Sequence, residues 1–330
     1  MTHPWPAGAA TGIGSLPGTD IDEALRVVLG ELPELPHLPE LPARGAGADM
    51  IGRGAALLAE LPVEIQPSGW RLTARPGRDL RRSRDFLERD LDALEAAASG
   101  HSGVLKVQAV GPWTLAAGIE LPGGHRVVSD HGAVRDLAES LTEGLRAHLA
   151  EVARRVPGAT IVAQLDEPSI PAVLAAQIPT PSGYGTVRAV EASVVEQTLG
   201  DVLAIVPEGA RVVHCCAADV PIALLRGAGA SAIAVDAAPT LDQDAVGEAI
   251  EAGTSLWLGV VPGTDATISL DSARDPVRKL WRQLGFADSD LAGAVVPTPA
   301  CGLAGASPAY ARRAMSLVRD VGRALLDLEA

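Results

Sequence analysis

The most reactive group of side chains in this sequence is His214-Cys215-Cys216, and a third cysteine lies at position 301. Because side chains alternate along a β-strand, His214 and Cys216 would project from one side of a strand and Cys215 from the other. Zinc binds imidazole and thiolate groups in tetrahedral geometry, and a catalytic zinc keeps its fourth position open. We therefore expect His214, Cys216 and Cys301 to bind zinc. The competing interpretation is that the thiols fill the core and that His214 is a satisfied core histidine.

Three acidic residues and one serine are further candidates. Asp236 follows a short apolar run, where it could be a fourth metal ligand or could equally cap a turn. Asp166 and Glu167 follow another run, and their carboxylates could hold the ammonium group of an amino-acid substrate or move a proton. Ser15 lies among Gly12-Ile13-Gly14-Ser15-Leu16-Pro17, where close backbone approach and a hydroxyl suit a carboxylate ligand. A tight turn would explain the same glycines, and acidic residues are common where loops begin.

The proposed ligand set favours one kind of chemistry. Zinc held by two sulfurs and a histidine can bind an incoming thiol and lower its pKa, so that it reacts as a thiolate near neutral pH. Zinc hydrolases more often use histidine and carboxylate ligands, with which the metal ionises water. The sequence therefore favours alkylation of a thiol over hydrolysis.

The elements that would position these residues alternate regularly. Short apolar runs are each followed by a stretch rich in Ala, Leu, Arg and Glu, which predicts strands alternating with helices. The expected strands are Thr11–Ser15, Pro62–Gln66, Val104–Gln108, Thr160–Leu165, Arg211–Cys216, Ser231–Val235, Ser255–Val260 and Ala294–Val296. Eight such units favour an α/β fold of the (β/α)8 TIM-barrel type, and the candidate residues stand at strand ends, where such barrels carry their active sites. A dinucleotide-binding fold is disfavoured, because the glycines of Gly227–Ala232 lead into a strand rather than out of one.

We expect residues 1–330 to form a single catalytic-type barrel. The proline-rich segment Glu31–Gly47, with Pro33, Pro36, Pro39 and Pro42, cannot form a regular helix. We expect it to be a loop at the barrel mouth.

Composition narrows the setting and the partners. The formal net charge is −14, which argues against nucleic acid or an anionic membrane as a partner. The chain has no signal-like N-terminus and no apolar run of roughly 20 residues. Three cysteines do not make a disulfide framework, so we expect a cytoplasmic protein with reduced thiols. The oligomeric state is not specified by the sequence.

Five motifs together resemble the catalytic C-terminal barrel of the cobalamin-independent methionine synthase family. In chain order they are Ile13-Gly14-Ser15-Leu16-Pro17, Gly111-Pro112-Trp113-Thr114, Leu165-Asp166-Glu167-Pro168, His214-Cys215-Cys216 and Cys301-Gly302-Leu303. That family transfers a methyl group to the zinc-bound thiolate of homocysteine. The resemblance implies zinc ligation by His214, Cys216 and Cys301 and amino-acid contacts by Ser15 and Asp166.

The chain departs from the family pattern in four places. The family's glutamate ligand corresponds here to Asp236, and its Arg-Gly-Glu element reads Arg44-Gly45-Ala46. Pro262-Gly263-Thr264 stands where the family has a histidine after the seventh strand. The N-terminal half of the full-length enzymes, which helps to hold the folate donor, has no counterpart in this chain.

We accordingly expect a zinc-dependent methyltransferase similar to 5-methyltetrahydropteroyltriglutamate–homocysteine methyltransferases, with a role in methionine biosynthesis. Its partners would be a small-molecule thiol and a methyl donor. Asp166 would be the catalytic residue, and Ser15, Asp166 and Glu167 would bind the substrate. Two alternatives are a corrinoid-linked methyltransferase of the related barrel superfamily, with Trp113 and the proline-rich segment as corrinoid contacts, and a non-catalytic barrel that binds a metal or ligand.

Overall fold

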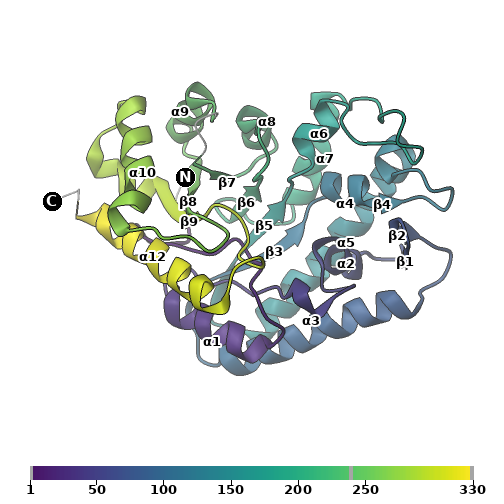
Figure 1. The fold of residues 1–330 in the computed structure, drawn as a ribbon, viewed down its shortest axis with the longest axis horizontal. Helices are drawn as coiled ribbons and strands as arrows, with labels where there is room; N and C mark the ends of the chain where they lie inside the picture. Colours follow the sequence, from purple (N-terminus) through teal and green to yellow (C-terminus); the bar gives the residue numbers. More distant parts are fainter. Residues whose placement is uncertain (1–2, 238–240, 328–330) are drawn as a thin grey trace.

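The centre of the molecule is a curled parallel sheet of six strands (Figure 1). The computed structural model describes residues 3–237 and 241–327. In spatial order the strands are β3 (Gly103–Val110), β5 (Ala159–Asp166), β6 (Arg211–His214), β7 (Ala232–Asp236), β8 (Ser255–Val261) and β9 (Val295–Pro299). Sequential neighbours pair in parallel because each strand is followed by a segment that returns over the outside of the sheet. An α/β fold with a parallel sheet is therefore confirmed.

Two further extended segments link the edges of this sheet. The amide of Thr11 donates to the carbonyl oxygen of Pro297 in β9, at 3.3 Å. Ser15 forms a parallel bridge with Glu40, and His37 forms one with Lys106 of β3. Hydrogen bonds thus pass from β9 through residues 11–15 and 36–40 to β3.

The second expected strand, Pro62–Gln66, does form, but it lies outside the parallel sheet. β1 (Val63–Gln66) pairs with β2 (Gly69–Leu72) as an antiparallel hairpin, and β4 (Ile119–Glu120) completes this separate small sheet. Its place beside β3 is taken by the centre of the proline-rich segment. The missing N–H groups of Pro36 and Pro39 interrupt a regular ladder, which explains why a strand was not expected there.

The proline-rich segment is not a loop laid over the mouth. Leu35, Leu38 and Leu41 are each 0% exposed, so every third residue of the segment anchors it in the core. The first expected segment, residues 11–15, lies next to β9 but forms only isolated contacts with its neighbours and no regular strand.

Helices cover the convex side of the sheet (Figure 1). They are α1 (Ile21–Glu31), α2 (Met50–Leu57), α3 (Arg78–Ala97), α4 (Pro112–Gly118), α5 (His131–Arg155), α6 (Ile170–Leu174), α7 (Ala192–Leu203), α8 (Ile222–Gly227), α9 (Gln243–Glu251), α10 (Leu270–Leu284), α11 (Leu291–Ala294) and α12 (Pro308–Leu326), with short 3-10 turns at Pro42–Arg44, Val127–Ser129 and Asp288–Asp290. The last helix lies beside the first, where Arg319 Nη1 contacts Glu31 Oε2 at 3.0 Å. Within the described residues, no helix is both long and apolar enough to cross a membrane.

The two faces of the sheet have different cores. The larger apolar cluster, which contains Cys215 and Val213, packs against the helices. The smaller cluster includes Val162, Val212 and Trp257, which alternate with the residues of the larger cluster along their strands and therefore face the concave side. His214 shares the face of Val212, so the chemically capable side chains lie above this inner core.

Candidate metal centre

The end of β6 presents its two candidate ligands to the same side, as the alternation predicted. Nitrogen and sulfur atoms of His214, Cys216 and Cys301 all lie within 4.8 Å of one another. Cys216 Sγ and Cys301 Sγ are 3.3 Å apart. Cys215 is 0% exposed on the opposite face. The structure therefore brings together three of the four residues that the sequence analysis nominated as metal ligands.

This group fits a zinc ion. With Zn–S bonds of about 2.3 Å, two tetrahedral sulfur ligands stand about 3.8 Å apart, which is close to the observed sulfur separation. His214 Nε2 is buried and has no hydrogen-bond partner among the described residues. Both ring nitrogens of His37 are likewise buried without a partner in the described part of the chain, so the Nε2 atom of His214 is informative because it lies beside two sulfurs, where it suits a metal ligand. Two sulfurs and one nitrogen leave a fourth tetrahedral position open.

The contact between the two thiols shifts their pKa values in opposite directions. Contact with Cys216 lowers the pKa of Cys301 to about 6, whereas contact with Cys301 and burial raise the pKa of Cys216. Metal binding would release any proton that the two sulfurs carry, because thiolates rather than thiols are the ligands.

Asp166 lies beside His214, the candidate histidine ligand. Its Oδ1 atom is 2.8 Å from His214 Nδ1 and accepts a hydrogen bond from Gln164 Nε2 at 2.7 Å. β5 and β6 pair Asp166 directly with His214, which is why the two side chains meet. The sequence analysis placed Asp166 at the site but did not anticipate this contact with His214.

Glu167 is oriented differently from its neighbour. The side chain is 0% exposed, and its oxygens accept hydrogen bonds from Trp113 N at 2.9 Å, Thr114 N at 2.8 Å and Thr114 Oγ1 at 2.7 Å. It thus caps the first turn of α4 from inside the protein. Burial raises the pKa of Glu167 to about 7, and these hydrogen bonds act in the opposite direction. The expected contact of Glu167 with substrate does not fit this geometry, because all of its hydrogen bonds are made inside the protein.

Ser15 lies where the first and last strand segments meet. Its carbonyl oxygen accepts a hydrogen bond from Leu303 N at 2.8 Å. A Cβ atom on Gly302 would lie 2.0 Å from Ser15 Oγ, so the Ser15 hydroxyl lies directly against the Cys301 loop in the absence of a side chain at position 302. Contact of Ser15 with a substrate stays a prediction.

Asp236 ends β7, and its side chain is exposed. Asp236 does not belong to the cluster of His214, Cys216 and Cys301, whose ligand atoms lie within 4.8 Å of one another. Its role as a metal ligand stays a prediction.

A buried polar set below the metal ligands was missed by the sequence analysis. Lys106, Gln108 and Gln164 are at most 3% exposed. Burial lowers the pKa of Lys106 to about 7. Glu40, whose pKa is raised by burial, pairs with Arg53 Nε at 3.2 Å. The available signal was the polar residue at every second position of two apolar strands, which marks one face of each strand as polar.

A small cavity lies within this polar set. Its volume is about 10 Å³, and its lining includes Glu40, Arg53, Gln108 and Asp166. Two carboxylates, one guanidinium and one amide therefore converge there, and Asp166 joins them to His214.

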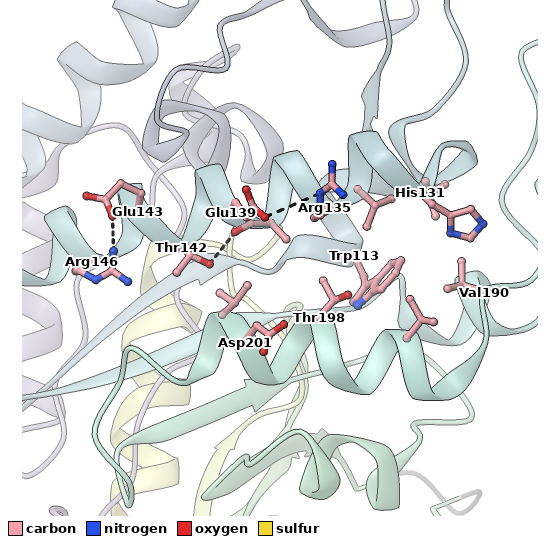
Figure 2. A pocket seen from close by; sticks show the side chains of 15 residues that line it. Trp113, His131, Arg135, Glu139, Thr142, Glu143, Arg146, Val190, Thr198 and Asp201 are labelled. Atoms are coloured by element: carbon pink, nitrogen blue, oxygen red, sulfur yellow. Dashed lines mark hydrogen bonds and ion pairs between the residues drawn. The ribbon is translucent and has the colours of Figure 1, made fainter.

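A larger pocket of about 420 Å³ lies in the outer helical layer, between α5 and α7 (Figure 2). Trp113 is part of its lining but is only 1% exposed, and its indole N–H donates to Val195 O. Arg146 pairs with Glu143 of its own helix (Figure 2). None of the residues lining this pocket belongs to the cysteine cluster. The expectation that Trp113 offers a corrinoid contact at the mouth is not supported, because its ring is packed within this layer.

Comparisons with known proteins agree with the fold. A family model described as cobalamin-independent synthase, catalytic domain, matches residues 8–324. A B12-independent methionine synthase from Shewanella sp. W3-18-1, solved in complex with selenomethionine, is similar with a TM-score of 0.62 and 13% identity, over 98% of both chains. A methyltransferase from Methanosarcina mazei is similar with a TM-score of 0.53 and 16% identity, over 98% of this chain and 94% of that one. Curated protein sequences gave no match.

Proposed function

The chain belongs to the family of the cobalamin-independent synthase catalytic domain, and on that premise we propose that it is a zinc-dependent methyltransferase acting on the sulfur of an amino-acid thiol such as homocysteine. The observation that carries this proposal is the buried, unpartnered Nε2 atom of His214, grouped with the sulfurs of Cys216 and Cys301. Bound zinc would lower the pKa of an incoming thiol so that it reacts as a thiolate. A reducing, cytoplasmic setting that keeps both cysteines as ligands is part of the proposal.

We further propose that the two bridging segments complete a (β/α)8 barrel. Residues 11–15 would be its first strand and residues 36–40 its second, since hydrogen bonds join them to each other and to both edges of the sheet. Ser15, Asp166 and the metal ligands would then share the C-terminal rim of one barrel, where active sites of this fold lie.

Asp166 has one oxygen suited to the amino group of such a substrate. Among the described residues, Gln164 and His214 form hydrogen bonds with Oδ1 of Asp166. The other carboxylate oxygen, Oδ2, is therefore left for an ammonium group. Glu40 lines the same cavity and adds a second carboxylate, although Arg53 offsets its charge. Ser15, held beside the Cys301 loop, would offer its hydroxyl to the substrate carboxylate.

The role of Asp166 predicts a specific loss of amine recognition. We expect wild type to bind homocysteine roughly 10- to 150-fold more tightly than 4-mercaptobutanoate, which lacks only the amine, because a charge-assisted hydrogen bond contributes about 1.5–3 kcal/mol. Asp166→Asn should bind both thiols alike when each is titrated at saturating zinc. The exposed Asp271→Asn of α10 is the matched control and should keep the preference. An Asp166→Asn protein that still prefers homocysteine would disprove the contact.

The proposed function is tested by an assay of methyl transfer to homocysteine, in which each methyl donor is supplied separately. We expect the zinc-loaded protein to form methionine from homocysteine without needing a folate polyglutamate, because the net charge of −14 disfavours a polyanionic tail. The Shewanella protein, matched over 98% of its chain, is described as B12-independent, so methyl-folate monoglutamate and a methyl-corrinoid must both be tested. Turnover only with the corrinoid would favour the corrinoid-linked alternative. Tight zinc binding without turnover of any donor would favour the non-catalytic barrel.

A further inference from the structure

A row of buried polar side chains ends at the metal-binding histidine. Lys106 Nζ donates to Gln164 Oε1 at 2.7 Å, and Gln164 Nε2 donates to Asp166 Oδ1 at 2.7 Å. Asp166 Oδ1 in turn lies 2.8 Å from His214 Nδ1. Lys106 and Gln164 are 0% exposed, so no water competes for these bonds. The row spans the neighbouring strands β3, β5 and β6.

Each bond in this row can run in only one direction. The backbone carbonyl oxygen of Ile13 and the Asp166 carboxylate can only accept, so the NH2 group of Gln164 must face them and its oxygen must face Lys106. The Ile13 carbonyl oxygen reinforces this orientation, because it accepts from Lys106 Nζ at 2.7 Å and from Gln164 Nε2 at 2.9 Å. The amide NH2 group is therefore turned toward Asp166. An ionised carboxylate has no proton to donate, so the hydrogen between Asp166 and His214 must be on Nδ1.

We propose that Lys106 and Gln164 are positioning residues that fix His214 as the Nδ1–H tautomer, so that its Nε2 lone pair is always available to the metal. The proposal rests on the metal site described above, although its structural part concerns the metal-free protein. Without Lys106 the Gln164 oxygen would lose its donor, and the amide would be held less firmly in its hydrogen bond to Asp166. Asp166 would then hold the histidine ring less firmly, and groups of this kind tune metal affinity although they never touch the metal.

The first test reads the tautomer directly. Nitrogen-15 spectra of the metal-free protein, with the His214 signal identified by its loss in His214→Gln, should show a protonated Nδ1 and an unprotonated Nε2. Protonated Nε2 in the wild-type protein would overturn the proposal whatever the variants do. This measurement does not depend on zinc, so it separates failure of the proposal from failure of the proposed function, which would show as wild-type protein without zinc affinity.

The second test perturbs the row at its far end. Lys106→Met keeps the length of the side chain but removes the donor, and Gln164→Glu keeps the shape but removes the NH2 group that Asp166 needs. We expect a mixture of His214 tautomers in both proteins and a loss of zinc affinity of about 10-fold, measured by competition with a chelator. The exposed Lys279→Met is the matched control and should behave as wild type. If either variant folds with an unchanged tautomer and unchanged zinc affinity, Lys106 and Gln164 do not position the histidine.

Discussion

Cys216→Ser and Cys301→Ser are each expected to lose most of their zinc, whereas wild type should retain about one zinc ion per chain. A serine hydroxyl stays protonated near neutral pH and is a poor substitute for a thiolate, so the loss of affinity should exceed the roughly 100-fold that changes outside the ligand shell reach. The effect should be this large in either variant, because the histidine and one remaining sulfur are too few ligands for a tight site. Metal analysis of protein dialysed against a weak chelator measures it.

Cys215 provides the matched control. Its thiol is 0% exposed on the apolar face of β6, away from the cluster, and burial raises the pKa of Cys215 to about 12. Cys215→Ala is a cleaner control than Cys215→Ser, because a serine there would bury a hydroxyl in an apolar core. Cys215→Ala should keep its zinc. Zinc content that is unchanged in both Cys216→Ser and Cys301→Ser would remove the basis of the proposed function.

The three clustered candidate ligands could be found from sequence because residue type and strand alternation act locally. A histidine and a cysteine two residues apart on a strand must share a face, and the end of a barrel strand is a place where chemistry is expected. The partner of that strand, which brings Asp166 against His214, depends on the register of the sheet. Register is a property of the folded chain. Asp166 could therefore be placed at the site, but its contact with His214 could not be predicted.

The bridging role of residues 36–40 could not be predicted for a related reason. Prolines make residues 36–40 a poor candidate by local rules, since Pro36 and Pro39 cannot donate to a ladder. The segment is held instead by three leucines that enter the core and by single bridges to Ser15 and Lys106. These interactions join parts of the chain that are distant in sequence, and local patterns contain no information about them.

Two of the family motifs, Leu165–Pro168 and Gly111–Thr114, are joined by the hydrogen bonds of Glu167, and this contact is structural. We expect Glu167→Ala to lower the free energy of unfolding by about 3–5 kcal/mol, because it leaves three buried donors of Trp113 and Thr114 without an acceptor at about 1–3 kcal/mol each. Glu167→Gln keeps the volume and one acceptor oxygen but turns an NH2 group toward the donors, so about 1–3 kcal/mol should be lost. Urea unfolding with a chelator present measures both values. Loss of less than about 1 kcal/mol in Glu167→Ala would mean that α4 does not depend on this cap.

The pH dependence of the same variants tests the charge state of the cap. The pKa of Glu167 is raised from 4.5 to about 7 by burial. Between these two values the folded protein binds more protons at this site than the unfolded chain does, so the contribution of Glu167 to stability should fall as the pH rises from 4.5 to 7. Glu167→Gln cannot titrate, and the stability difference between wild type and this variant should therefore be larger at about pH 5 than at about pH 8. The reverse order would mean that the three donors at the start of α4 outweigh burial and keep Glu167 ionised.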